Sequence, residues 1–164
     1  MSDKKFGIRF ADVNDVSIIL KFIKELAVYE KLEHEVTATE EILKEWIFEK
    51  KKCEVLIALE DDIEIGYALF FHNFSTFLGK AGIYLEDLYI TPNCRGLGYG
   101  KKLLKEVAKI AVDRGCGRLD WQCLDWNKSS IDFYLSINAL QMSSWTSYRL
   151  SYNVLRKFVY ENDV

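Results

Sequence analysis

The sequence predicts an α/β protein built on a mixed sheet with helices on both faces. Apolar segments of strand length alternate with segments whose apolar residues recur at helical spacing. Hydrophobic residues make up 49% of the chain, enough for a real core, and a single proline argues against extended linkers. We expect the order β-α-α-β-β-β-α-β-α-β, with residues 1–164 forming a single domain.

The first half is expected to hold a strand, two helices and a hairpin. Asp12 precedes a segment with helical spacing and can cap it, and Thr37 followed by Glu40 has the spacing of a capping box. Two apolar runs joined across residues 60–62 predict the hairpin. The expected elements are strand 6–10, a helix over 16–27, a helix over 42–47, and strands 53–59 and 65–71.

The second half is expected to alternate strands and helices. The best helix follows a third long strand, and Gly115 can stop it. The apolar and aromatic tail predicts one or two closing strands. The expected elements are strand 82–90, helix 99–114, strand 118–124, helix 129–137 and tail strands within 142–159.

Composition narrows the possible partners and location. A net charge of -3 does not favour nucleic acid, which needs a basic surface. The four cysteines have neither C-x-x-C spacing nor a histidine at ligand spacing, so we expect no metal and reduced thiols in a cytoplasmic protein. The chain has no apolar run of ~18 residues and no apolar signal core at its start, so we expect no membrane segment.

The segment NCRGLGYGKK, residues 93–102 and here called the glycine loop, has the parts of an anion site. Glycines let the backbone approach a ligand, and the helix that follows offers unpaired N–H groups at its positive end. Arg95 adds a charge-assisted donor. The loop fits neither a dinucleotide fingerprint nor a P-loop, because Lys101 and Lys102 stand where glycine and a hydroxyl are required. A glycine-rich turn without a ligand is the alternative.

Two carboxylates interrupt the apolar strand before this loop. Alternation would place Glu86 with Tyr84 and Leu88 on one face, and Asp87 with Leu85 and Tyr89 on the other. Burying a charged carboxylate costs free energy, so such an acid is expected to be paired with another group or to have a function. Either one can take a proton from an ammonium group, and a structural role is the alternative for Asp87.

Three blocks of sequence carry a family resemblance: IKELAVYEKLEHEV (23–36), YLEDLYITPNCRGLGYG (84–100) and LDWNKSSIDFY (124–134). They resemble the GNAT acyltransferase superfamily, and within it the diamine acetyltransferase branch of spermidine/spermine and thialysine N-acetyltransferases. The resemblance implies a mostly antiparallel sheet with a splayed central strand pair. It also implies direct acetyl transfer from acetyl-CoA to a small primary amine, and a homodimer.

The resemblance implies roles for residues at matching positions. By this match Glu86 is the substrate-binding base, and Tyr134 is the acid that protonates the leaving thiolate. Periodicity alone instead predicts that Tyr134 is a core aromatic. The Leu88 N–H becomes the oxyanion donor. Contacts to acetyl-CoA map to Leu88, Tyr89, Ile90, Arg95, Gly96, Leu97, Gly98, Tyr99, Gly100, Lys101, Asn127, Lys128, Ser129 and Ser130. Contacts to the acceptor map to Tyr29, Glu30, Glu86, Asp120, Trp121 and Gln122.

At two places the sequence departs from the family pattern, and these departures affect which family properties we expect of this chain. Asn138 stands where glycine is usual, and asparagine tolerates the left-handed backbone that a helix end needs. Trp145 and Thr146 stand where the polyamine enzymes carry acids, which favours a shorter or less cationic acceptor, such as a diamine or a lysine-like amino acid. The remaining alternatives are a non-catalytic acyl-CoA sensor, a protein N-acetyltransferase, and a merely solvated acidic loop at residues 29–35.

Overall fold

The computed structural model describes residues 4–161 and divides into two compact units, Met1–Leu124 and Asp125–Val164. The first unit holds the sheet and the helices packed on it. The second holds two helices joined by an irregular segment.

The sheet of the first unit has five strands in the order in which they occur along the chain. The first three ladders are antiparallel and the last is parallel, so the predicted mixed, mostly antiparallel sheet is confirmed. The strands are β1 (Phe6–Phe10), β2 (Glu54–Glu60), β3 (Ile63–Ser75), β4 (Lys80–Ile90) and β5 (Leu119–Trp121).

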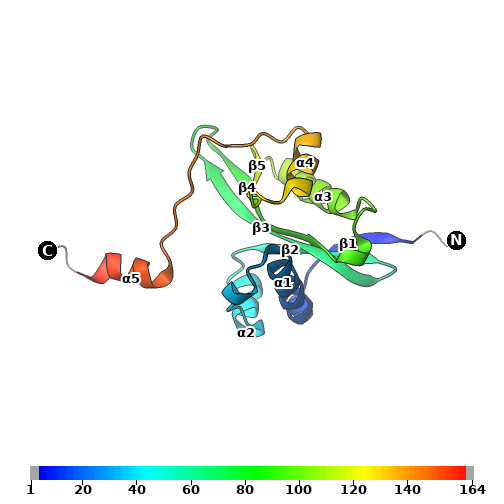
Figure 1. Ribbon diagram of the computed structural model, residues 1–164, viewed down its shortest axis with the longest axis horizontal. Helices are drawn as coiled ribbons and strands as arrows, with labels where there is room; N and C mark the ends of the chain where they lie inside the picture. Colours follow the sequence, from blue (N-terminus) through cyan, green and yellow to red (C-terminus); the bar gives the residue numbers. More distant parts are fainter. Residues whose placement is uncertain (1–3, 162–164) are drawn as a thin grey trace. The chain divides into compact units, whose positions relative to one another are not determined.

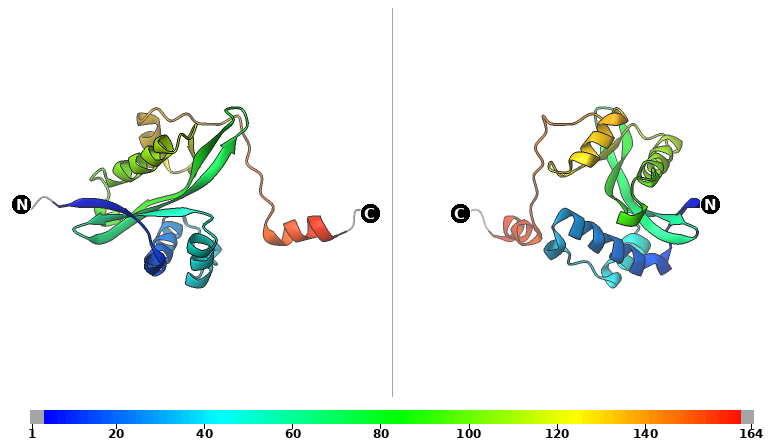
Figure 2. Two further views of the ribbon diagram at one scale, coloured as in Figure 1. Left: turned by 180° about the vertical axis from the view of Figure 1, so that it is seen from behind. Right: turned by 45° about the vertical axis from the view of Figure 1, so that its right-hand side comes forward.

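Helices cover both faces of this sheet, as predicted (Figures 1 and 2). On one face, α1 (Val16–Glu30) buries Ile19 and Phe22 in a core cluster that includes Tyr67 and Tyr89. On the other, α3 (Tyr99–Asp113) buries one apolar stripe, in which Leu103 and Val107 are fully inaccessible. Shorter elements of this unit are η1 (Val13–Asp15), η2 (Glu33–Glu35), α2 (Glu40–Leu43), the π-helix η3 (Lys44–Glu49) and η4 (Pro92–Cys94).

Local capping explains where the first helices begin. The Asp12 side chain accepts from the backbone N–H of Asn14 and forms a capping box with Asp15, as its position predicted. Asp15 in turn accepts two hydrogen bonds from the Arg9 guanidinium, at 2.6 and 2.8 Å, which ties β1 to α1. The expected cap at Thr37 is wrong: Thr39 Oγ accepts from the Ile42 N–H, and α2 begins two residues later than a Thr37 cap would place it.

The hairpin between β2 and β3 and the end of α3 follow the prediction. Asp61 and Asp62 adopt left-handed backbone at φ 50° and 64°, which suits a tight two-residue turn. Gly115, at φ 67°, follows the last turn of α3 and lets the chain leave the helix.

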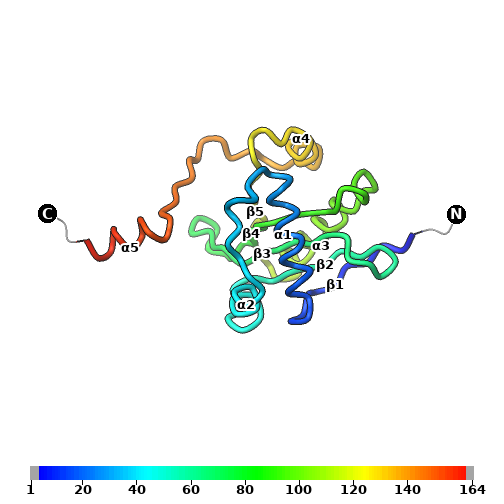
Figure 3. The backbone as a smooth tube through the Cα atoms, turned by 60° about the horizontal axis from the view of Figure 1, so that its bottom comes forward, coloured from blue at the N-terminus to red at the C-terminus, as the bar shows by residue number. Residues whose placement is uncertain are grey.

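The second unit confirms one expectation and corrects another. Helix α4 (Lys128–Ser136) is capped by Asn127, and Asn138 has φ 63°, the left-handed conformation expected of it. The tail strands expected within residues 142–159 are wrong, because the chain there runs irregularly and then forms α5 (Tyr152–Tyr160), visible in Figure 3. Val154, Leu155, Phe158 and Val159 recur at helical spacing and account for this helix.

Candidate active site

A β-bulge in β4 places Glu86. In the pairing with β3, Leu69 lies opposite Asp87 and Phe70 lies opposite Leu85, so Glu86 is the extra residue. Its side chain is exposed. The expected alternation is therefore wrong across this point, because Asp87 and Leu85 fall on opposite faces of the sheet rather than the same one. Bulges re-aim side chains and are common beside active sites.

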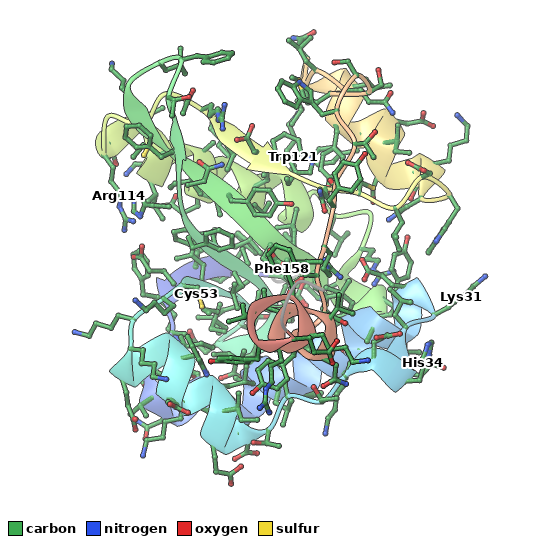
Figure 4. All side chains as sticks on the ribbon, turned by 90° about the vertical axis from the view of Figure 1, so that its left-hand side faces the viewer. Lys31, His34, Cys53, Arg114, Trp121 and Phe158 are labelled. Carbon is green, nitrogen blue, oxygen red and sulfur yellow. The ribbon has the colours of Figure 1, made fainter. Side chains whose placement is uncertain are left out.

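The splay expected between the central strands begins at the same place. The parallel ladder of β4 with β5 ends at the pair Leu85 and Trp121, whereas β4 continues to Ile90. Figure 4 labels Trp121 where β5 ends. Over residues 86–90, the described part of the chain thus pairs β4 only with β3.

The free edge of β4 carries the backbone groups of Leu88 and Ile90. The Thr91 N–H donates to Ile65 O of β3 at 2.8 Å, so by alternation Ile90 and Leu88 turn their backbone groups away from β3. Consistently, Ile90 O accepts from Arg95 Nε at 2.8 Å. The Leu88 N–H therefore lies on the edge where the oxyanion donor and the pantetheine contacts were expected.

Asp87 lies in a mostly buried position beneath this edge. The Tyr67 hydroxyl donates to Asp87 Oδ2 at 2.6 Å, and Tyr67 itself is fully buried. Burial raises the pKa of the Asp87 carboxyl, and the Tyr67 hydrogen bond only partly offsets that effect. Burial, with the Asp87 charge, raises the pKa of Tyr67 well above its ordinary value. Sequence reasoning missed Tyr67, which lies on an apolar strand without a polar neighbour pattern.

Three acids from two elements converge around Tyr67. Glu30, the last residue of α1, has its pKa raised by burial and then by the charge of Asp87. The charges of Asp87, Glu30 and Glu86 all act on the Tyr67 phenol. Cys53, labelled in Figure 4, has its thiol pKa raised by burial and then by the charge of Asp87. This concentration of negative charge attracts a cation, and burial raises the pKa of two of its carboxyls, Glu30 and Asp87.

Replacing Asp87 with asparagine is expected to stabilise the protein. The amide removes a buried charge and still accepts from Tyr67, so the free energy of unfolding at neutral pH should rise by on the order of 1 kcal/mol. Because the folded-state pKa of Asp87 is raised, its protonation stabilises the wild type at low pH and that contribution is lost as pH rises through the folded pKa. The gain should therefore shrink on acidification.

Urea unfolding at several pH values measures this difference. Asp113→Asn is the matched control, because Asp113 is an exposed acid whose i,i+4 ion pair with Lys109 should be worth little. A lower stability of Asp87→Asn at neutral pH would contradict the burial argument.

The glycine loop has the geometry that a pyrophosphate requires. Gly96 and Gly98 have φ of 78° and 79°, and a Cβ on either would meet no atom within 4 Å. Gly98 is the N-cap of α3 and brings no capping side chain, so no cap side chain competes with an anion for the first-turn N–H groups of α3. These residues fit the diphosphate of acetyl-CoA.

The Arg95 side chain connects the beginning of this loop to α1. Besides its bond to Ile90 O, its guanidinium lies over the rings of Tyr29 and Tyr89, 4.7 and 5.3 Å from their centroids. Tyr29, expected at the acceptor site, and the loop expected at the co-substrate are thus in contact. Lys31 and His34, labelled in Figure 4, follow Tyr29 and Glu30 in the acidic loop.

The remaining predicted residues divide between the two units. Asp120 accepts a hydrogen bond from Asn73 Nδ2 at 2.9 Å and forms an ion pair with Arg118 Nε at 2.7 Å, and the neighbouring Gln122 is exposed. In the second unit, Asn127 caps the helix that contains Lys128, Ser129 and Ser130, and the Tyr134 ring packs on Phe133 at 5.3 Å between centroids. The expected roles of these residues stay predictions.

Comparison with known proteins decides the family. The profile of the acetyltransferase (GNAT) family matches residues 20–138. The chain belongs to this family. It is similar to thialysine N-epsilon-acetyltransferase of Sus scrofa, at 36% identity over 92% of this chain and 95% of that protein. It is also similar to L-ornithine N5-acetyltransferase of Arabidopsis thaliana, at 30% identity over 91% of this chain and 86% of that one.

A solved structure shares the fold of this chain. An integron cassette protein from the mobile metagenome of V. cholerae superimposes with a TM-score of 0.79 at 28% identity, covering 94% of this chain and 98% of that one. Family membership makes this chain an acetyl-CoA-dependent N-acetyltransferase acting on an amine. Within residues 4–161, this acetyltransferase has no helix long and apolar enough to cross a membrane.

Proposed function

We propose that this acetyltransferase moves the acetyl group of acetyl-CoA directly to the side-chain amine of a small lysine-like amino acid or diamine. The observation that carries the proposal is that Glu86 and Asp87 lie at the bulge of β4, where its ladder with β5 has ended, while the charge of Glu30 acts on the same buried tyrosine, Tyr67. An acceptor amine is cationic at neutral pH, so it needs a carboxylate both to attract it and to take its proton.

The catalytic steps follow from what each residue offers. Glu86, exposed at the bulge, takes the proton from the ammonium group directly or through water. The amine nitrogen then bonds to the acetyl carbon, and the Leu88 N–H stabilises the developing oxyanion. The carbon–sulfur bond breaks, and Tyr134 donates its phenolic proton to the thiolate.

The co-substrate is proposed to lie along β4 and the loop after it. Its pantetheine arm pairs with residues 88–90, and its diphosphate binds the N–H groups of residues 96–101 with Arg95 beside them. The opposite side of the co-substrate is contacted by Asn127, Lys128, Ser129 and Ser130. The family profile matches residues 20–138 and so extends from the first compact unit into the second, which supports residues 1–164 acting as one acetyltransferase domain.

The acceptor is proposed to carry fewer positive charges than a polyamine. Trp145 and Thr146 replace the acids of the polyamine enzymes, so an acceptor with its own carboxylate meets no acidic repulsion there. The names of two relatives, thialysine and L-ornithine acetyltransferases, refer to amino acids with a side-chain amine. Tyr29, Glu30, Asp120, Trp121 and Gln122 are the proposed acceptor contacts.

A thiol-release assay with acetyl-CoA across a panel of amines tests this function. The panel holds thialysine, lysine, ornithine, putrescine, spermidine, spermine and a peptide with a free N-terminus. We expect the highest kcat/KM with the amino acids or the diamine. Preference for spermine would refute the argument from Trp145 and Thr146, and activity only on the peptide would replace the proposal with protein acetylation.

We also propose a cytoplasmic homodimer. The four cysteines are free thiols, which suits a reducing compartment. Trp145, Tyr148 and Tyr152 are 72%, 93% and 71% exposed, which suits a contact surface. Light scattering should give a mass near twice the 19.1 kDa of the chain. A mass of one chain at all concentrations would contradict the dimer.

A further inference from the structure

The junction between the glycine loop and α3 is held by a buried tyrosine. Tyr99, the first residue of α3, is 7% exposed, whereas the residues directly before it are exposed. Its hydroxyl donates to Glu60 Oε1 at 2.8 Å, and its ring stacks on Phe6 with centroids 4.5 Å apart. The first turn of α3 is thus tied to the end of β2 and the beginning of β1.

Glu60 is fixed from a second side. Lys4 Nζ donates to Glu60 Oε2 at 2.8 Å, so the carboxylate joins the chain before β1 to α3. The Lys4 hydrogen bond, then that of Tyr99, lowers the pKa of Glu60, and its charged form is the acceptor at neutral pH. A hydrogen bond to a charged acceptor is stronger than one between neutral groups.

The loop itself has little packing of its own. A Cβ at Gly96 or Gly98 would meet no neighbour within 4 Å, and the side chain of Leu97 is half exposed. Leu103 and Leu104 anchor α3 from its second turn onward. The first turn, whose N–H groups would bind the diphosphate, is held against fraying by the side chain of Tyr99.

We propose that Tyr99 and Glu60 are positioning residues, which hold the first-turn N–H groups of α3 in the orientation that binds the diphosphate of acetyl-CoA. The inference rests on the proposed location of the co-substrate and goes beyond it, because neither side chain needs to touch the ligand. Preorganisation of this kind acts on the affinity for acetyl-CoA and leaves the transfer step unchanged.

Calorimetric titration of acetyl-CoA into Tyr99→Phe is the central test. The variant keeps the ring stack on Phe6 and loses only the hydroxyl. We expect Kd to rise about tenfold, ~1.4 kcal/mol, with kcat at saturating substrates unchanged. Tyr84→Phe is the matched control: it removes the hydroxyl of another tyrosine whose ring packs on a phenylalanine, Phe71, with centroids 5.3 Å apart, and it should leave the Kd for acetyl-CoA unchanged.

Variants of Glu60 test whether the two residues act together. Glu60→Gln keeps an acceptor for the Tyr99 hydroxyl and should weaken acetyl-CoA binding less than Glu60→Leu does. In a Tyr99→Phe background, Glu60→Leu should cost little further affinity, because the shared hydrogen bond is already gone. Hydrogen exchange of the free protein should be faster at the first hydrogen-bonded N–H groups of α3, beginning with that of Lys102, which donates to Gly98 O at 3.0 Å, and unchanged elsewhere.

The outcomes separate this inference from the proposed function. Wild-type protein that does not bind acetyl-CoA would overturn the proposed function itself. Wild-type binding with an unchanged Kd in Tyr99→Phe would overturn only the positioning role. Faster hydrogen exchange throughout the sheet, or additive losses in the double variant, would also overturn it, because they indicate a general contribution to stability.

Discussion

Glu86→Gln should lower kcat/KM for the amine by about 10²-fold at neutral pH. Glutamine has nearly the shape of glutamate and keeps the bulge of β4, but it cannot take a proton from the ammonium group. The loss should shrink as pH rises towards the amine's own pKa, about 10, because the free amine then needs no base. Steady-state rates measured from neutral to alkaline pH give this profile.

Glu64→Gln is the control for this substitution. Glu64 is a partly exposed acid of the adjacent strand β3, and its carboxylate forms a long ion pair, 3.7 Å, with the Arg9 guanidinium. Its replacement removes the same charge without touching the bulge, so kcat/KM should stay near the wild-type value. A loss in Glu86→Gln that is constant across pH would show that Glu86 binds or positions the amine without acting as its base.

Tyr134→Phe should lower kcat by about 10²-fold and leave the Kd for acetyl-CoA unchanged. The phenyl ring preserves the packing on Phe133, so α4 keeps its structure and Tm should not fall. What is lost is the proton for the leaving thiolate, an effect confined to the transition state. Single-turnover kinetics and calorimetry separate the two quantities.

Tyr148→Phe is the matched variant within the same unit. Tyr148 is 93% exposed, and the loss of its hydroxyl should change neither kcat nor Kd. An unchanged kcat in Tyr134→Phe would return Tyr134 to the role of packing residue that its periodicity alone favours. A weakened Kd with unchanged kcat would instead make it a binding residue.

Much of the fold was predictable because local signals agreed with tertiary packing. The apolar run of β4, the stripe on α3 and the turn at Asp61 and Asp62 each encode their structure within a few residues. The same holds for the glycine loop, where glycine at left-handed positions precedes a helix.

The bulge at Glu86 was not predictable in this way. Its existence depends on which residues of β3 lie opposite Leu85 and Asp87, and strand register is set by the partner rather than by the strand's own sequence. The side of the sheet that Asp87 faces therefore could not be read from alternation. The partner of Asp87, Tyr67, lies twenty residues away and was missed for the same reason.

The prediction of strands within residues 142–159 was wrong for a different reason. Tyr148, Tyr152 and Val154 belong to residue types that favour strands, and their number outweighed the helical spacing of Val154 to Val159. The structure forms α5 there. Propensity is a weak guide where a segment has few neighbours to pack against.

The sequential order of the five strands bears on how the chain reaches this fold. Two of the four ladders, β2 with β3 and β3 with β4, join strands separated by a short turn, whereas the ladder of β1 with β2 spans α1 and α2 and the ladder of β4 with β5 spans α3. The entropy lost in closing loops is therefore small for the two hairpins and concentrated in the two connections that contain helices. During synthesis Glu30 and Asp87 emerge before the glycine loop, so two of the carboxylates proposed to attract the amine precede the loop proposed to bind the diphosphate.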